Sequence, residues 1–156
     1  MSHEKLLLDF YTAFNEKNAT DMVSCYHKNI VFEDPIFGKL KGDKARKMWH
    51  WICYKGEDLK VTHSDITIDE DKGFAKCEVR YTYGERKRPI LNRISAEFEF
   101  KDGKIIRHED TFDLKTWATQ AIGWKGKVIG GTSYFKKKLQ FRSRKLIQNF
   151  EIVHTD

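Results

Sequence analysis

The sequence has few of the residues that break or cross-link a chain. Only two prolines and ten glycines occur among 156 residues, too few for a collagen-like or low-complexity protein. The three cysteines, Cys25, Cys53 and Cys77, are widely separated, odd in number and without a C-x-x-C pair. We therefore expect the three cysteines to be small buried hydrophobic residues of a protein in a reducing compartment. We expect them to form neither disulfides nor a zinc site.

The sequence also lacks a long hydrophobic run. No stretch approaches the roughly 18 apolar residues that span a bilayer. Glu4, Lys5 and Asp9 interrupt the amino terminus where a secretory signal needs an unbroken apolar segment, so we expect a cytoplasmic protein. Nucleotide-binding glycine loops, a G-x-S-x-G elbow and an H-E-x-x-H motif are absent, and the histidines are scattered singly. The sequence therefore predicts neither a metal nor a cofactor.

The residues that are present suit a single domain with a substantial core. Hydrophobic residues make up 40% of the chain and aromatic residues 13%. The net charge of +6 is unevenly spread: residues 1–113 hold 20 Lys/Arg and 21 Asp/Glu, whereas residues 114–150 hold nine Lys/Arg and no acid. We therefore divide the chain into a near-neutral domain, residues 1–113, and a basic helical extension, residues 114–156, packed on the same domain.

Periodicity predicts an α+β fold. Apolar spacing indicates a helix over residues 3–16, a short helix capped by Asn18 with Tyr26 on its inner face, and a third helix after Gly42. Four long strands follow between residues 59 and 113, after a short strand over residues 30–32. These elements describe a curved antiparallel sheet wrapped over three N-terminal helices.

Three further features refine the prediction. The alternation slips near Ser64-Asp65, which indicates a bulge, and Asp102-Gly103 is a strong hairpin signal. In the extension we expect a helix over residues 114–122, a glycine-rich loop, and a final helix over residues 133–150.

The last predicted strand carries two adjacent polar residues on one face. If the face with Phe112 points inward, His108 and Asp110 lie side by side on the concave face of the sheet. A carboxylate beside an imidazole fixes the tautomer of the ring and raises its basicity, which is how a general base is made. The alternatives are a satisfied core pair, or a strand of the opposite parity with both residues in water.

Asp34 is the second candidate. It lies before Pro35 among apolar neighbours, and desolvation there would raise its pKa towards the value that a base needs at neutral pH. The alternative is a turn residue that caps the following loop, which is common at Asp-Pro.

Several quoted segments resemble a known superfamily. The helices, "VFEDPIFG", the strand meander and "EFEFKDGKIIRHEDTFD" together resemble the nuclear transport factor two-like superfamily, and within it the SnoaL-like and ketosteroid-isomerase-like groups. The resemblance covers residues 3–113 and implies a cone-shaped, usually homodimeric fold with a pocket. It places Asp34 at the isomerase base, but Phe10 and Ala96 at the two oxyanion donors. The resemblance therefore disfavours steroid isomerisation and favours SnoaL-like acid/base chemistry.

The resulting hypothesis is a cofactor-independent acid/base enzyme for a small apolar molecule, namely an isomerase, cyclase, dehydratase or epoxide hydrolase. The proton-transfer groups would be Asp34, His108 and Asp110. The residues expected to line the pocket or contact the substrate are Tyr11, Trp49, His63, Tyr81, Asn92 and Phe112. The alternative is a binding or assembly module with the same cavity and no turnover.

The basic final helix leaves three interpretations open. It could be a docked helix with a solvated basic face. It could also be an amphipathic helix that makes a weak contact with an anionic membrane. Nucleic-acid binding is the third and is disfavoured, because no binding motif accompanies the charge.

Overall fold

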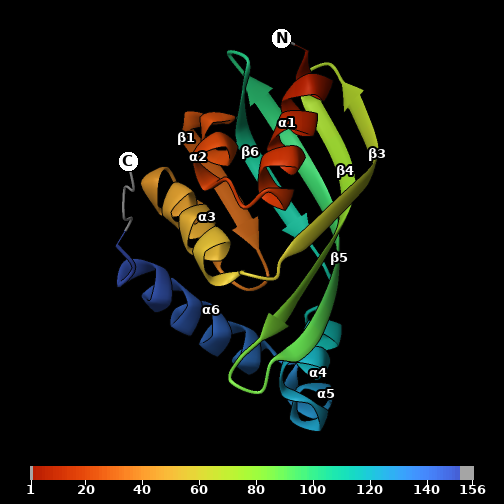
Figure 1. The fold of residues 1–156 in the computed structure, drawn as a ribbon, viewed down its shortest axis with the longest axis vertical. Coiled ribbons are helices and arrows are strands. Elements are labelled where there is room, and N and C mark those ends of the chain that lie inside the picture. The colour runs from red at the N-terminus through yellow and green to blue at the C-terminus, as the bar shows by residue number, and fades with distance from the viewer. Residues whose placement is uncertain (1, 152–156) are drawn as a thin grey trace.

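The computed structural model describes residues 2–151 (Figure 1). Six helices and six strands lie along these residues. In chain order they are α1 (His3–Asn15), α2 (Ala19–Ser24), β1 (Tyr26–Asp34), β2 (Gly38–Lys41), α3 (Asp43–Lys55), β3 (Lys60–Asp69), β4 (Lys72–Tyr83), β5 (Arg88–Lys101), β6 (Lys104–Thr111), α4 (Leu114–Ile122), α5 (Trp124–Ile129) and α6 (Ser133–Gln148).

The strands form one curved sheet in the order β2-β1-β6-β5-β4-β3. The α+β class, the N-terminal helices over the sheet and the C-terminal helices are confirmed. The sheet is mixed, however, because β1 pairs with β6 in parallel while the other neighbours are antiparallel. The short edge strand β2 was not predicted, since its four residues carry too little alternation to indicate a strand.

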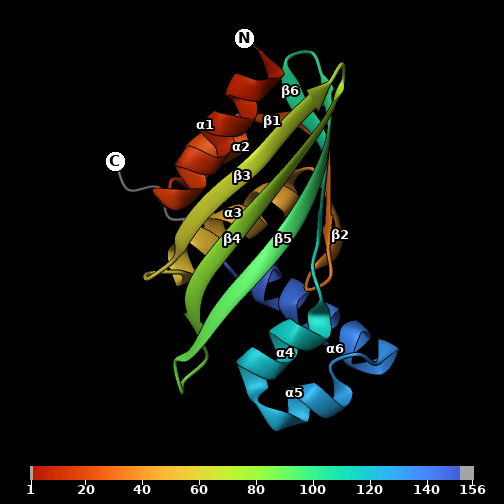
Figure 2. The ribbon, with the colours of Figure 1, turned by 90° about the vertical axis from the view of Figure 1, so that its right-hand side faces the viewer.

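Helices α1, α2 and α3 cover the concave face of the sheet (Figures 1 and 2). Helix α1 begins at Ser2, whose side chain caps the helix, and it buries one apolar face that includes Phe10 and Tyr11. On the sheet, the inward residues of β4 and β5 alternate with exposed ones, as a half-buried strand requires. The core therefore lies between the sheet and these helices.

Two local predictions about the sheet are confirmed. The register of β3 against β4 shifts between Ser64 and Thr67, and Asp65 has a φ of 55°. Asp102 and Gly103 have φ values of 53° and 74°, as both central residues of a type I′ hairpin must.

The C-terminal helices close one end of the sheet (Figure 2). Helix α4 has the predicted bounds, and its Trp117, Ala118 and Ala121 pack with Ile90 in a second apolar cluster. Helix α5 lies where we expected a loop. Its Gly126 packs directly against the carbonyl of Ala118, where a Cβ atom would not fit. The glycine thus reflects close helix packing and not a flexible segment.

Helix α6 ends at Gln148, two residues before the predicted end. It packs along α3 and the β1–β2 loop, which it reaches with the side chains of Gln140 and Arg144. The part of the extension from residue 152 onward lies outside the described residues. Among residues 2–151, no helix is both long and apolar enough to cross a membrane.

Candidate functional site

A chain of buried hydrogen bonds crosses the inside of the fold, from α3 through β1 to β6. The indole Nε1 of Trp49 donates to the Tyr26 hydroxyl at 2.8 Å. The Tyr26 hydroxyl lies 2.7 Å from His108 Nδ1, and His108 Nε2 lies 2.8 Å from Asp110 Oδ1. The four side chains are buried, so each polar atom in the chain relies on its neighbour in place of water.

The direction of these bonds follows from what each group can donate. An indole N–H can only donate, so Tyr26 accepts from Trp49 and its own hydrogen is free for His108 Nδ1. A neutral imidazole that accepts at Nδ1 carries its hydrogen at Nε2 and donates it to Asp110. With Tyr26 as the donor to Nδ1, the hydrogen of a neutral His108 lies on Nε2, where it points at Asp110.

The His108 ring is enclosed by aromatic side chains. It is 1% exposed, and the ring centroids of Phe98 and Phe32 lie 4.4 Å and 5.1 Å from its own. Phe10 and Trp49 complete the enclosure. Because both ring nitrogens are engaged and the ring faces are covered, His108 positions Asp110 and offers no free nitrogen to a ligand.

Asp110 has the free atom that His108 lacks. Its Oδ1 is held by His108, whereas Oδ2 accepts no hydrogen bond from residues 2–151. The prediction that His108 and Asp110 share the inward face of β6 is therefore confirmed. The roles of the two side chains are the reverse of those expected. The imidazole orients the carboxylate, where the sequence had suggested that the carboxylate orients the imidazole.

Asp34 lies beside Asp110 at the end of β1. The parallel register pairs Phe32 with His108 and Glu33 with Glu109, so the next residues along both strands come level with each other. Burial raises the pKa of Asp34 to about 7, and the negative charge of Asp110 adds to this increase. A carboxyl group with a raised pKa next to a second carboxyl group is a combination that acid/base sites use.

The alternative interpretation of Asp34, as a turn residue, also holds. Its Oδ1 accepts from the backbone N–H of Ile36 at 3.0 Å and from that of Phe37 at 2.6 Å. These two bonds fold the chain back after Pro35, and they oppose part of the pKa increase. The turn fixes Oδ1 and leaves Oδ2 without a hydrogen bond among the described residues.

Helix α6 holds the other side of the same turn. Gln140 Nε2 donates to the Pro35 carbonyl at 3.2 Å, and Arg144 Nε donates to the Phe37 carbonyl at 2.7 Å. The Pro35 carbonyl and the Ile36 N–H belong to one peptide group. That group therefore accepts from α6 on one side and donates to Asp34 on the other, and hydrogen bonds arranged in this way polarise one another.

Two further polar groups inside the fold lack strong partners. The Tyr11 hydroxyl is fully buried beside the thiol of Cys77, a weak acceptor, and has no other hydrogen-bond partner in the described part of the chain. Burial raises its pKa well above the ordinary value, and the charge on Asp110 adds to this effect. Asn92 is buried on the concave face, and its side-chain amide makes no hydrogen bond within residues 2–151. A buried hydroxyl without a strong partner is costly, so Tyr11 is a candidate for contact with a ligand. Asn92 is a second candidate because it lies on the same face of the sheet, although its amide atoms are not fully buried.

The remaining predicted contact residues do not converge on Asp110. His63 stacks on Tyr11, so it lies on the inward face as expected, but it is exposed because β3 is an edge strand. An edge strand has a neighbour on one side only, which leaves its inward residues open to solvent. Tyr81 is partly buried and accepts from Trp117 Nε1 at 2.8 Å, and Phe112 packs between the two apolar clusters.

Three residues form long-range hydrogen bonds that sequence patterns do not indicate, namely Tyr26, Gln140 and Trp117. Tyr26 was assigned to the short second helix, but it begins β1 and bridges Trp49 and His108. A register shift between Tyr26 and Val31 hides the strand period there. Gln140 and Trp117 belong to the extension, and no local pattern indicates which distant groups they reach.

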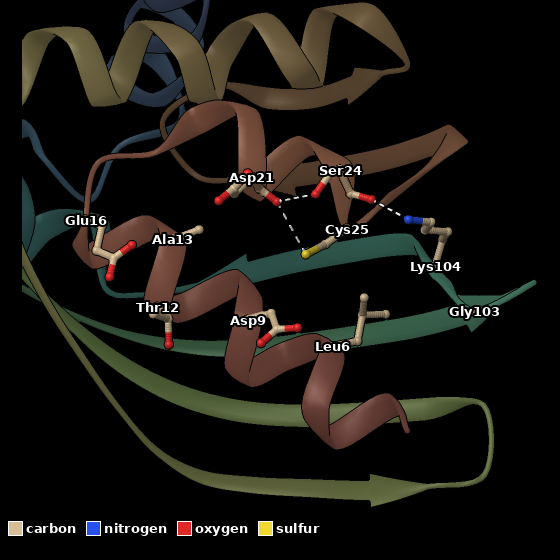
Figure 3. Close-up of a pocket in the computed structure, with 10 residues that line it drawn as sticks. All are labelled: Leu6, Asp9, Thr12, Ala13, Glu16, Asp21, Ser24, Cys25, Gly103 and Lys104. Atoms are coloured by element: carbon tan, nitrogen blue, oxygen red, sulfur yellow. Dashed lines mark hydrogen bonds between the residues drawn. The ribbon is translucent and has the colours of Figure 1, made fainter. Parts of the chain in front are cut away.

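Two surface hollows lie away from these residues. One, of about 340 Å³, runs between α1, α2 and the β5–β6 turn and includes Asp9, Cys25 and Lys104 (Figure 3). The other lies between α3 and the end of α6. Neither includes Asp34 or Asp110. In the described part of the chain, no three His, Cys, Asp or Glu side chains come together in a way that could hold a metal ion.

Comparison with protein families identifies the chain as a member of the SnoaL-like domain family, whose profile matches residues 7–108. The suspected superfamily is thereby confirmed. A search of curated proteins finds no match.

Solved structures with the same fold include three of interest. A ketosteroid isomerase-like protein from Catenulispora acidiphila, in complex with trimethylamine, has a TM-score of 0.67 at 12% identity, over 75% of this chain and 92% of that one. An LEH-like epoxide hydrolase from M. tuberculosis has a TM-score of 0.63 at 16% identity, over 81% and 89%. A candidate polyketide cyclase from Xanthomonas campestris has a TM-score of 0.62 at 18% identity, over 74% and 93%. At these identities the likenesses establish the fold alone.

Proposed function

We propose that this protein is a cofactor-independent acid/base enzyme that moves a proton on a small apolar substrate with a carbonyl or epoxide group. The observation that carries the proposal is the hydrogen-bond chain that ends at Asp110, with the carboxyl group of Asp34 next to it. The protein would belong among the isomerases, cyclases, dehydratases or epoxide hydrolases of this fold.

The two carboxyl groups would divide the acid and base roles. Asp110, held by His108 through Oδ1, would take a proton through Oδ2 from a carbon next to a carbonyl, or from a water that attacks an epoxide. Asp34, with its pKa near 7, is partly protonated at neutral pH and would give its proton to the substrate oxygen. On the carbonyl route the substrate loses a proton from carbon to Asp110 and gains one at oxygen from Asp34. Return of the Asp110 proton to a carbon and of the oxygen-bound proton to Asp34 then gives the product and restores the site. On the epoxide route the attacking water loses a proton to Asp110, the epoxide oxygen gains one from Asp34, and after the diol leaves the proton on Asp110 passes to Asp34 through solvent.

The Tyr11 hydroxyl is a candidate hydrogen-bond donor to the substrate oxygen. Its raised pKa keeps it protonated, and among residues 2–151 its hydrogen meets only the thiol of Cys77, a weak acceptor that a developing oxyanion would displace. A preorganised donor aimed at a developing oxyanion contributes roughly 10²–10³ in rate in enzymes where it has been removed. Phe10 and Ala96 stand at the two oxyanion-donor positions of ketosteroid isomerases and cannot donate. Tyr11 would supply one donor in their place.

Proton exchange with solvent tests the proposal even while the substrate is unidentified. Small cyclic ketones and 1,3-dicarbonyl compounds are incubated with the protein in D₂O, and mass spectrometry measures deuterium uptake at carbon. We expect catalysed exchange that falls by about 100-fold or more in Asp110→Asn. Glu109→Gln is the matched control, because Glu109 lies next along β6 and is paired with Arg107. Equal exchange in wild type and Asp110→Asn would contradict the assignment.

A non-catalytic binding module is the second candidate. It is favoured by the closure of the site, since His108 is 1% exposed and Trp117 of α4 is bonded to Tyr81 at the end of the sheet. Native mass spectrometry of the purified protein distinguishes the two. A co-purified compound that is recovered unchanged, together with no exchange on any ketone, would support binding alone.

A further inference from the structure

The solvent-facing side of α6 carries a regular row of aromatic and basic residues. Tyr134, Lys138, Phe141 and Lys145 are spaced by four, three and four residues, so they lie along one side of the helix. We call this row the outer stripe. The opposite side carries the buried residues Ser143 and Ile147, which pack against the domain.

The aromatic residues of the outer stripe are unusually exposed. Tyr134 is 71% exposed and Phe141 63% exposed. Lys138 Nζ lies 5.5 Å from the centre of the Tyr134 ring, and Lys145 Nζ lies 4.8 Å from that of Phe141. A row of rings with a cation over each is amphipathic along its length, and it contributes nothing to the core.

A second exposed apolar site lies on the neighbouring helix α5. Trp124 is 73% exposed and Val128 69% exposed, and a spacing of four residues puts both on one side of that helix. Helix α5 and the start of α6 occupy the same end of the molecule (Figures 1 and 2). Exposed apolar groups that accumulate in one part of a surface mark an interaction site more often than isolated ones do.

The charge of this region is uncompensated. Residues 114–150 hold nine Lys/Arg and no acid, and none of these nine forms an ion pair within residues 2–151. A partner that meets the region must therefore supply negative charge and accept apolar side chains at the same time. A bilayer with anionic headgroups does both, because aromatic rings and lysines are suited to the headgroup level.

We propose that the outer stripe of α6 docks this protein on the surface of an anionic lipid bilayer. Tyr134 and Phe141 would enter the headgroup region, and Lys138 and Lys145 would contact the anionic headgroups. A second copy of the chain fits less well, since a two-fold contact through this row would bring like charges together. The inference does not depend on the proposed enzymatic function.

Vesicle sedimentation of the full chain tests the proposal. The probes are vesicles of phosphatidylcholine alone and vesicles in which about a third of the lipid is phosphatidylserine. We expect binding to the anionic vesicles only, and a loss of binding as salt is added. Reversing three exposed lysines of α6, Lys137→Glu, Lys138→Glu and Lys145→Glu, should weaken binding by about 100-fold or more. The matched control reverses three exposed lysines elsewhere, Lys44→Glu, Lys60→Glu and Lys101→Glu, and should retain most of the binding.

The aromatic contribution is tested separately. Tyr134→Ser with Phe141→Ser should weaken binding to anionic vesicles by about tenfold or more, while circular dichroism and the melting temperature stay unchanged because both side chains are exposed. Equal binding to neutral vesicles, or equal loss in the α6 and control charge variants, would overturn the proposal. Two other results would also overturn the proposal. In the first, the chain does not bind vesicles but dimerises through this face in ultracentrifugation. In the second, the chain does not bind vesicles but binds single-stranded oligonucleotides.

Discussion

The inside of the cone and the C-terminal extension handle polar groups in opposite ways. Inside, Trp49, Tyr26, His108 and Asp110 are buried and bonded in sequence, so each side chain constrains the next. On the outside of α6, the lysines have no acidic partner among residues 2–151 and two aromatic rings are open to water. Burial forces pairing, and pairing defines a site of fixed geometry. Exposure without pairing leaves a surface available for a partner.

The largest effect we expect is a difference in stability between equivalent aromatic residues of the two regions. Phe32 is buried beside His108, whereas Phe141 lies in the outer stripe. Phe32→Ala should lower the free energy of unfolding by about 3–5 kcal/mol, and Phe141→Ala by about 0.5 kcal/mol or less. Urea denaturation measures both. Similar losses would mean that α6 is held more tightly than its exposure indicates.

The second effect is a pH dependence of stability that Asp34 imposes. Its pKa of about 7 in the folded protein lies above the ordinary 3.8, so between these values the folded state holds a proton that the unfolded state has lost. The free energy of unfolding therefore falls as pH rises from about 4 to 7, by at most about 4 kcal/mol. Asp34→Asn keeps the turn acceptor and removes this titration. Denaturation at several pH values gives the free energy of unfolding of wild type and variant. The difference between these two free energies should shrink towards low pH.

The third effect tests the middle of the buried chain. Tyr26→Phe removes the hydroxyl that accepts from Trp49 and donates to His108, which leaves two buried polar atoms unpaired. We expect a loss of about 1–3 kcal/mol. Tyr134→Phe, which removes an exposed hydroxyl from the outer stripe, should change stability very little. Thermal unfolding of the two variants side by side gives the comparison, and equal melting temperatures would contradict the assigned network.

The smallest effect concerns the contact between the two regions. Gln140→Leu removes the donor to the Pro35 carbonyl, so the Ile36 N–H becomes a slightly weaker donor to Asp34. The pKa of Asp34 should rise by a few tenths of a pH unit, measured by carbon NMR of the carboxyl group. Gln148→Leu, at the far end of α6, is the control and should leave that pKa where it is. A change of the same size in both variants would point to a general loosening of the helix.

Sequence patterns could predict most of the fold because the core strands alternate cleanly. The bulge at Ser64-Asp65, the turn at Asp102-Gly103 and the bounds of α4 were all readable from local residues. Helix α5 was not, because glycines that allow close helix packing look the same in sequence as glycines of a loop. The parallel pairing of β1 with β6 joins residues far apart in the chain, and no local signal specifies it.

The sequence could predict several residues of the candidate site, but not the hydrogen bonds that join them. Strand parity placed His108 and Asp110 together, and the Asp-Pro motif drew attention to Asp34. Both interpretations of Asp34 hold at once, since a carboxyl group can cap a turn with one oxygen and keep the other free. Tyr26 and Gln140 could not be found, because their roles depend on bonds to elements that only folding brings near.

The turn that folds around Asp34 is held by hydrogen bonds from both the domain and the extension. The family profile ends at residue 108, whereas Gln140 and Arg144 hold the carbonyls of Pro35 and Phe37 from a helix more than twenty residues further on. A chain cut after residue 113 would therefore keep both proposed proton-transfer groups, Asp34 and Asp110, and the positioning residue His108, yet lose part of what sets the acidity of Asp34. The smallest unit that carries the chemistry would then be larger than the smallest unit that carries the fold.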